Sequence, residues 1–375
     1  MPFFEQQESG NALFLATYDS EHYTLISNVS VCESCSIVPQ SQNLHMSEVF
    51  HTTTFSNIAC LALQKTDGSA VVIAVAQGAG VIWSAPIETA SSTPIVDAKN
   101  RFVFVSTGHN IMTLDAATGA PLYSKSMDEK VGQLVLDNVG SVYALGSQLF
   151  NIYAFQVSHV VSRGKLSIVW QESVAAHINL PSDVSISFLG PPSTSPRLLS
   201  FLVRTNDGRT LAAAINVINR QFRASVLSED YNLIAFTNTP LILDQRDKAY
   251  LPYLTASGDK IGIASFTAGK YNQPHLETVA PYVGIQAALI LQSNATNTNL
   301  FTIVSDNSNS YLVIYNPSRP SSSTCQLLTN YPTMIRATEA VTEQMAAIIS
   351  VVRNTSAKVD HQVAYFREGR VWYRF

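Results

Sequence analysis

One short pattern of residues recurs along the whole chain and limits what it can fold into. A stretch of apolar residues is followed by a polar segment containing Gly, Asn, Asp or Ser, and then by a second, alternating stretch. Because these polar residues tolerate positive φ or satisfy their own backbone, each copy predicts two antiparallel strands joined by a turn. The copies are LFLATYDSEHYTLIS, CLALQKTDGSAVVIAV, FVFVSTGHNIMTLD, SVYALGSQLFNIYAF, SFLVRTNDGRTLAAAINV, AYLPYLTASGDKIGIASF, LFTIVSDNSNSYLVIY and IISVVRNTSAKVDHQVAYF.

These hairpins repeat along the chain with an irregular but sustained period. Residues in the middle of their first strands are 47, 42, 39, 59, 49, 52 and 46 positions apart. A repeat of about 40 to 50 residues with several short strands is typical of β-propeller blades. The residues used for this spacing are Leu15, Ala62, Phe104, Tyr143, Leu202, Leu251, Ile303 and Ile349.

The clearest repeat predicts four strands. Its inner strand is Ser92–Asp97, its second Arg101–Thr107, its third Asn110–Ala116 and its outer strand Ala120–Ser126. A four-stranded sheet with two apolar faces cannot bury both alone, so such sheets stack around an axis. The sequence therefore predicts an all-β chain, a single β-propeller domain over residues 1–375. Eight four-stranded antiparallel blades are expected, with seven as the alternative.

The two ends of the chain bear on how such a ring closes. The first hairpin unit begins at Asn11 without a recognisable inner strand before it. We therefore expect the C-terminal residues Arg370–Phe375 to complete the first blade. The alternative is that they form the outer strand of the last blade.

The segment LDAATG, Leu114–Gly119, preceded by PIVD and FVFVS, resembles the blade motif of the PQQ-like (quinoprotein-type) β-propeller family. The resemblance covers about Ala70–Trp170, and the next repeat lacks Asp-x-x-Thr-Gly. Asp115, Thr118 and Gly119 match the family's turn, and the resemblance implies that they hold the turn rather than act in catalysis.

Three large aromatic residues occupy matching late positions in successive repeats. They are Trp83, Tyr123 and Trp170, with gaps of 40 and 47 residues. A large aromatic side chain at this position is expected to cover the joint between neighbouring blades. Together with the turn residues, these three form the predicted structural motif.

The family's dehydrogenases would need a quinone, a metal held by oxygen ligands and a carboxylate base. The chain has no adjacent cysteine pair and no C-x-x-C-H motif, so we expect no cofactor and no catalytic site. Cys32 and Cys35 form a C-x-x-C in a strand setting, which predicts either two cysteines on a hairpin or a local disulfide. A zinc site is not expected, because Cys60 and Cys325 are solitary. No two histidines have metal-binding spacing, and they are expected at the surface or in turns.

The acidic pairs Asp128–Glu129, Glu229–Asp230 and Asp244 with Asp247 are expected to be solvated residues in connections between strands. The longest connection, about Val157–Arg197, has two interpretations. It either adds an insertion that covers one mouth of the ring or binds a partner, or it contains an ordinary outer strand, KLSIVWQES, and a longer loop.

Charged residues make up only 13% of the chain, against about 25% in typical domains, and the net charge is −4. This composition gives no support for a nucleic-acid partner. The apolar run Ser69–Ile87 is interrupted by Gly and Gln, which predicts two strands rather than a membrane span. The N-terminus lacks the features of a secretory leader, so the chain is expected in the cytoplasm if that terminus is native, and secreted or lumenal if a leader has been removed.

These observations favour a monomeric, non-catalytic interaction or scaffold module that binds a protein partner. Two alternatives remain. One is a quinoprotein-type oxidoreductase or glycan-active enzyme with a site at the central channel. The other is a lumenal or extracellular sensor domain, glycosylated at Asn28, Asn294 and Asn354.

Overall fold

The computed structural model describes residues 50–226 except 57, 66, 77–78, 98, 138, 161–162, 179–184 and 196, together with the strands outside that range and the adjacent Asp247 and Asn316. Within this part, the secondary structure is antiparallel β-sheet apart from one short helix, α1 (Val174–Ile178). The chain forms two compact units, Met1–Val174 and Ala175–Phe375.

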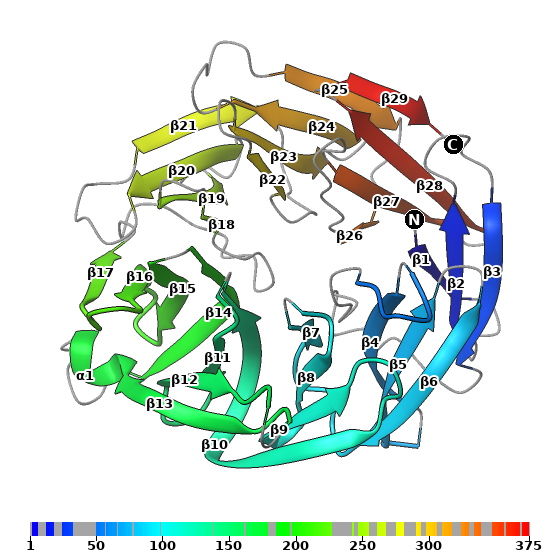
Figure 1. Ribbon diagram of the computed structural model, residues 1–375. Helices are drawn as coiled ribbons and strands as arrows, with labels where there is room; N and C mark the ends of the chain where they lie inside the picture. The colour runs from blue at the N-terminus through cyan, green and yellow to red at the C-terminus, as the bar shows by residue number, and fades with distance from the viewer. Residues whose placement is uncertain are drawn as a thin grey trace. The chain divides into compact units, whose positions relative to one another are not determined.

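The described strands of the first unit form three sheets, each built from strands that are consecutive in the sequence (Figure 1). Phe50 forms an isolated bridge with Ile58, at the place where the second of these sheets would have an inner strand. The strands are β1 (Pro2–Gln6), β2 (Leu13–Tyr18) and β3 (Leu25–Cys32); β4 (Ile58–Gln64), β5 (Ala70–Ala76) and β6 (Gly80–Ile87); and β7 (Ile95–Val96), β8 (Phe102–Ser106), β9 (Gly108–Asp115), β10 (Pro121–Leu136), β11 (Val142–Gly146), β12 (Asn151–Val157) and β13 (Leu166–Ser173).

The long strand β10 joins two four-stranded groups into the seven-stranded sheet (Figure 1). Its first part pairs with β9, where Pro121 lies opposite Leu114. Its last part pairs with β11, where Leu136 lies opposite Val142. The strand is therefore the outer strand of the β7–β10 group and the inner strand of the β10–β13 group.

In the second unit, the described strands form four sheets of four antiparallel strands each. Strand β14 contacts β18 and β21 contacts β24, so neighbouring sheets touch. The strands are β14 (Ile186–Thr194), β15 (Leu198–Thr205), β16 (Thr210–Asn216) and β17 (Phe222–Val226); β18 (Ile242–Leu243), β19 (Lys248–Leu254), β20 (Ile261–Thr267) and β21 (His275–Ala280); β22 (Ile290–Ser293), β23 (Thr298–Ser305), β24 (Ser310–Tyr315) and β25 (Thr324–Thr329); and β26 (Met334–Thr338), β27 (Ala347–Thr355), β28 (Lys358–Arg367) and β29 (Arg370–Arg374).

Every hairpin that the sequence predicts is an antiparallel pair of strands in the structure. The expectation for the chain ends was wrong, because β1 pairs with β2 as an inner strand and β29 pairs with β28 as an outer strand. Strand β1 was missed because only Phe3 and Phe4 mark it in the sequence. The paired strands of the hairpins are β2–β3, β4–β5, β8–β9, β11–β12, β15–β16, β19–β20, β23–β24 and β27–β28.

The long connection after β12 contains an ordinary outer strand. The residues KLSIVWQES form β13 apart from Lys165, and α1 and the inner strand β14 follow. Residues Ser69–Ile87 likewise form β5 and β6 around a turn at Gly80. No helix in the described part of the chain has the length and hydropathy that crossing a bilayer requires.

The second strands β8 and β11 are buried on both faces. In β8, successive side chains point to opposite faces, so Val103 and Val105 join the cluster shared with β4–β6, whereas Phe102 and Phe104 join the cluster shared with β10–β13. All five residues of β8 are buried, as are all five of β11. The β7–β10 group is thus covered by a neighbouring sheet on both sides, as stacked blades require.

The cluster between the β7–β10 and β10–β13 groups gives a direct test of this packing. Phe155 of β12 is fully buried in it, so Phe155→Ala is expected to lower the free energy of unfolding by about 3 to 5 kcal/mol, measured by denaturant titration. The control is Val169→Ala on β13, whose side chain is 56% exposed and whose loss should change stability by less than about 0.5 kcal/mol. Equal effects of the two substitutions would contradict the described packing.

Candidate functional site

The turn between β9 and β10 is held together by one carboxylate. Asp115 Oδ1 accepts hydrogen bonds from the backbone N–H groups of Ala117 and Thr118 and from the Thr118 hydroxyl, each at 3.0 Å. Gly119 ends the turn with φ at 71°, and its N–H donates to the Asp115 carbonyl. The side chains of Asp115 and Thr118 are thus used within the turn itself.

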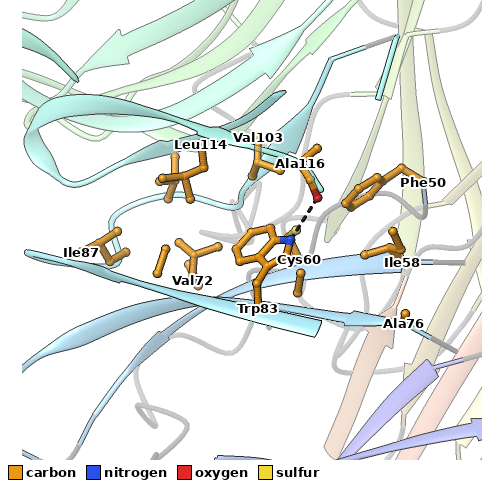
Figure 2. Close-up of a cluster of buried hydrophobic side chains, with 14 of the residues drawn as sticks. Phe50, Ile58, Cys60, Val72, Ala76, Trp83, Ile87, Val103, Leu114 and Ala116 are labelled. Atoms are coloured by element: carbon orange, nitrogen blue, oxygen red, sulfur yellow. Dashed lines mark hydrogen bonds between the residues drawn. The ribbon is translucent and has the colours of Figure 1, made fainter. Parts of the chain in front are cut away.

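Trp83 of β6 connects this turn to the preceding sheet (Figure 2). Its indole N–H donates to the carbonyl oxygen of Ala116 at 3.0 Å. The indole ring lies directly against Gly119, because a Cβ at Gly119 would be only 2.5 Å from Trp83 Cε3. Trp83 therefore covers the joint between the β4–β6 sheet and the β7–β10 group.

The other two aromatic residues of the predicted motif lie elsewhere. Tyr123 is half-buried in β10 and packs against the cluster between the β7–β10 and β10–β13 groups. Trp170 of β13 is buried against Tyr143 of its own group, with ring centroids 6.0 Å apart. The three aromatic residues are thus distributed over separate places and do not form one site.

The contact between Gly119 and Trp83 predicts that Gly119→Ala destabilises the protein through both backbone strain and steric overlap. The matched control is Gly68→Ala, since Gly68 also has positive φ, at 86°, but its Cβ would enter open space. Gly68→Ala should cost about 1 kcal/mol of unfolding free energy from strain alone. Gly119→Ala should cost about 1 to 3 kcal/mol more, because Trp83 must move. Urea unfolding of both variants measures the difference, and equal costs would rule out the described Trp83 contact.

Glu129 corrects one expectation from the sequence. It lies within β10, at the register break between the strand's two pairing regions, and is fully buried instead of solvated. Its carboxylate accepts hydrogen bonds from the backbone N–H groups of Gln148 and Leu149, at 3.0 and 2.7 Å. The Asn151 amide and the Tyr153 hydroxyl also donate to it, at 2.8 and 2.9 Å.

This buried carboxylate holds the turn between β11 and β12 onto β10. A side chain at Gly146 would overlap the Glu129 carboxyl group, which explains the glycine at the end of β11. Burial, followed by the hydrogen bond to Glu129, raises the pKa of Tyr153 to about 12, so this phenol stays protonated at neutral pH and donates a hydrogen bond to the carboxylate. No sequence pattern predicts this cluster, because Asp128 and Glu129 are adjacent acidic residues and only the side chain of Glu129 is buried.

Replacing Glu129 by Gln tests the cluster. The amide keeps the shape but loses the negative charge and turns an N–H₂ group toward donors, so we expect a loss of about 2 to 3 kcal/mol in unfolding free energy. Asp128→Asn is the control, since Asp128 is exposed and its neutralisation should change stability by less than about 0.5 kcal/mol. Denaturation at neutral pH measures both, and a neutral Glu129→Gln would show that the carboxylate is not needed.

Two other buried carboxylates hold turns in equivalent places, where an inner strand leads into a second strand. Asp97 Oδ1 accepts from the backbone N–H groups of Arg101 and Phe102, at 2.6 and 2.7 Å. Asp137 accepts from the Ser141 N–H at 2.8 Å and from the Tyr143 hydroxyl at 2.9 Å. Burial and then this bond to Asp137 raise the pKa of Tyr143. These carboxylates therefore belong to the structural framework.

The turn of Asp97 also carries the polar cluster that we take as the candidate binding site. This cluster comprises Asp97, Lys99, Asn100 and Arg101 of the turn, together with His51 and His159. Arg101 Nη2 donates to His159 Nδ1 at 3.1 Å, and the amide of Asn100 lies 3.3 Å from His51 Nδ1. The two histidines come from before β4 and after β12, and meet the same turn from either side.

His159 is the titratable group of this cluster with a shifted pKa. Burial lowers its pKa, the Asp97 carboxylate opposes this change, and the charges of Arg101 and Lys99 lower the pKa further. Sequence reasoning placed histidines in turns but had no signal that His159 would reach Arg101, 58 residues away. The arrangement can accept or release a proton beside the cations Lys99 and Arg101.

Some of the remaining predicted residues are described by the structure, and others lie outside the described part of the chain. Cys32 is the last residue of β3 and lies opposite Leu13, and Cys325 lies in β25 opposite Val313. Cys35, Glu229, Asp230 and Asp244 lie outside the described residues, so the disulfide stays a prediction. Asp247 accepts a hydrogen bond from the Ser195 hydroxyl at 2.5 Å. Among the described residues, no three His, Cys, Asp or Glu side chains gather in a group that would hold a metal ion.

Comparisons with known proteins bear on the fold. No protein-family model and no curated protein sequence matches the chain. A structure of the dihydro-heme d1 dehydrogenase NirN is 12% identical in sequence to this chain, with a TM-score of 0.62. The match covers 100% of this chain and 72% of the NirN chain. BamB from Moraxella catarrhalis is 14% identical, with a TM-score of 0.51, over 93% of this chain and 92% of its own. The WD40 domain of SCAP from fission yeast is 12% identical, with a TM-score of 0.50, and the match covers 82% of this chain and 81% of the SCAP chain.

These proteins are β-propellers, and the likeness extends over most of each chain. The fold is of the β-propeller type. At such identities the likeness concerns the fold alone, and the three proteins differ in what they do.

Proposed function

We propose that this chain is a single PQQ-like β-propeller of eight blades that serves as a non-catalytic scaffold and binds a protein partner as a monomer. The eight antiparallel hairpins support the blade number, with seven as the alternative. The β-propeller likeness supports the ring. The match of Asp115, Thr118 and Gly119 to the family turn supports the PQQ-like type.

One observation carries the functional part of the proposal. The buried carboxylates and phenols of the first unit, which are the groups with catalytic potential, are used to hold strands and turns in place. The Glu129 carboxylate accepts hydrogen bonds from Tyr153, Asn151 and backbone N–H groups. The Asp137 carboxylate accepts hydrogen bonds from Tyr143 and backbone N–H groups. A general acid or base needs to reach a substrate atom, and these side chains face other protein groups.

The exposed part of the first unit favours an interaction surface. Its turns carry exposed side chains, among them Lys99 and Arg101 at one end of the β7–β10 group and Arg163 and Lys165 after β12. Loops at the ends of rigid sheets are where binding residues concentrate, because the sheets fix their positions. A partner protein would use such loops without any change in the framework.

The test uses the full chain as bait in extracts of its native cells, followed by reconstitution. Each captured protein is expressed, purified alone and titrated against the chain by calorimetry. We expect at least one saturable one-to-one complex. In parallel, the purified chain is assayed for quinone-supplemented dye reduction and for glycan cleavage. Turnover in either assay, with no captured protein rebinding in purified form, would overturn the scaffold proposal in favour of an enzyme.

A further inference from the structure

The turns at one end of the β7–β10 and β10–β13 groups are rich in cations. Lys99 and Arg101 are exposed on the turn between β7 and β8, and Arg163 and Lys165 are exposed on the turn between β12 and β13. His51 is exposed and the side chain of His159 is 26% exposed. The described residues of these two turns include one carboxylate, that of Asp97.

The carboxylate of Asp97 is directed into the protein. Asp97 is only 2% exposed, and its oxygens accept from the backbone N–H groups of Arg101, Phe102 and Lys99. Its distance to His159 Nδ1 is 4.0 Å, at the limit of an ion pair. Asp97 therefore neutralises part of the local positive charge from the buried side of the cluster, and the solvent-exposed side stays cationic.

The guanidinium group of Arg101 is held in position for a ligand. It lies over the Phe102 ring, 5.8 Å from the centroid, and donates one hydrogen bond to His159 Nδ1. The His159 ring itself packs on Phe102, with centroids 5.4 Å apart. A guanidinium has five N–H donors in a planar fork that matches a carboxylate. No other hydrogen bond of this guanidinium is recorded among the described residues, and the side chain is exposed.

We propose that Lys99, Arg101 and His159, with His51 beside them, form a binding site for the carboxylate groups of an acidic segment of a protein partner. The site rests on the proposed function, since it names the surface through which this scaffold holds its partner. Cations next to a guanidinium fork favour carboxylates, because hydrogen bonds between Arg and a carboxylate are charge-assisted and frequently bidentate. A long nucleic acid is disfavoured by the net charge of −4 on the chain.

The same geometry makes binding depend on pH. The groups that face His159 are Asp97, Lys99 and Arg101 from the β7–β8 turn and the uncharged Phe102 ring from β8. Neutral His159 accepts the Arg101 hydrogen bond at Nδ1, and its protonation would place a further positive charge beside the cations. A bound carboxylate stabilises that protonated form, so binding takes up a proton and tightens as the pH falls toward and below the ordinary His pKa, since the pKa of free His159 is lowered.

The test measures fluorescence anisotropy of a fluorescein-labelled peptide of alternating Glu and Gly, titrated with the full chain. We expect saturable binding that weakens with added salt. Arg101→Gln should raise the dissociation constant about tenfold, the loss of about 1.4 kcal/mol expected for one charge-assisted contact. The control is Arg204→Gln, which removes an exposed cation from β15 and should change the constant by less than about twofold.

His159→Gln supplies the readout specific to the cluster. It should remove most of the tightening seen between about pH 8 and about pH 5, a range that extends well below the ordinary His pKa of about 6.5 because the pKa of His159 is lowered. Circular dichroism and thermal midpoints check that all three variants are folded. Equal affinities for Arg101→Gln and Arg204→Gln would overturn the site. Tighter binding of a single-stranded oligonucleotide than of the peptide, or full displacement by equimolar inorganic phosphate, would overturn the choice of ligand.

The outcome is separable from that of the proposed function. A reconstituted partner that binds Arg101→Gln as tightly as the unchanged chain would contradict this site and leave the scaffold proposal in place. Binding of the acidic peptide at Arg101 with no protein partner recovered would support the site and contradict the scaffold proposal.

Discussion

The constraint on which the structure depends is that its strands are apolar on both faces. All seven residues of β5 and all five of β8 are buried, whereas the outer strands β6 and β13 contain both buried and exposed positions. A sheet built on such strands must be covered on both faces, and apart from the five-residue helix α1 the described residues supply only other sheets for this cover. Burial of about 25 cal/mol for each Å² of apolar surface makes this cover the main source of stability.

The polar groups inside the first unit make sense against that constraint. Glu129, Asp97 and Asp137 do not interrupt the apolar clusters but sit at turns and at the break in β10, where backbone N–H groups lack strand partners. Leaving such groups buried and unpaired would cost about 1 to 3 kcal/mol each. Carboxylates at these places therefore let the chain turn sharply inside a packed region, and the position of the sheets follows from where they turn.

The features that sequence could predict are local, and those it missed depend on packing. Hairpin turns are marked by Gly, Asn and Asp within a few residues, so each was found, and the Asp115 turn was visible for the same reason. The contact of Trp83 with Gly119 was expected only as cover for a joint, because the residue that it covers lies in the next sheet. Glu129 was misjudged, since direction along a strand at a register break cannot be deduced from alternation. The meeting of His159 with Arg101 depends on how neighbouring sheets are set beside each other, which no spacing encodes.

Strand β10 gives the first unit a mechanical property that its other sheets lack. The strand is hydrogen-bonded into the β7–β10 group over its first half and into the β10–β13 group over its second, without a linker between them. Because the outer edge of one group and the inner edge of the next are the same strand, a shift of one is passed to the other through the backbone of β10. Force applied to a ligand at the turn between β7 and β8 would accordingly be transmitted to the β7–β10 and β10–β13 groups together.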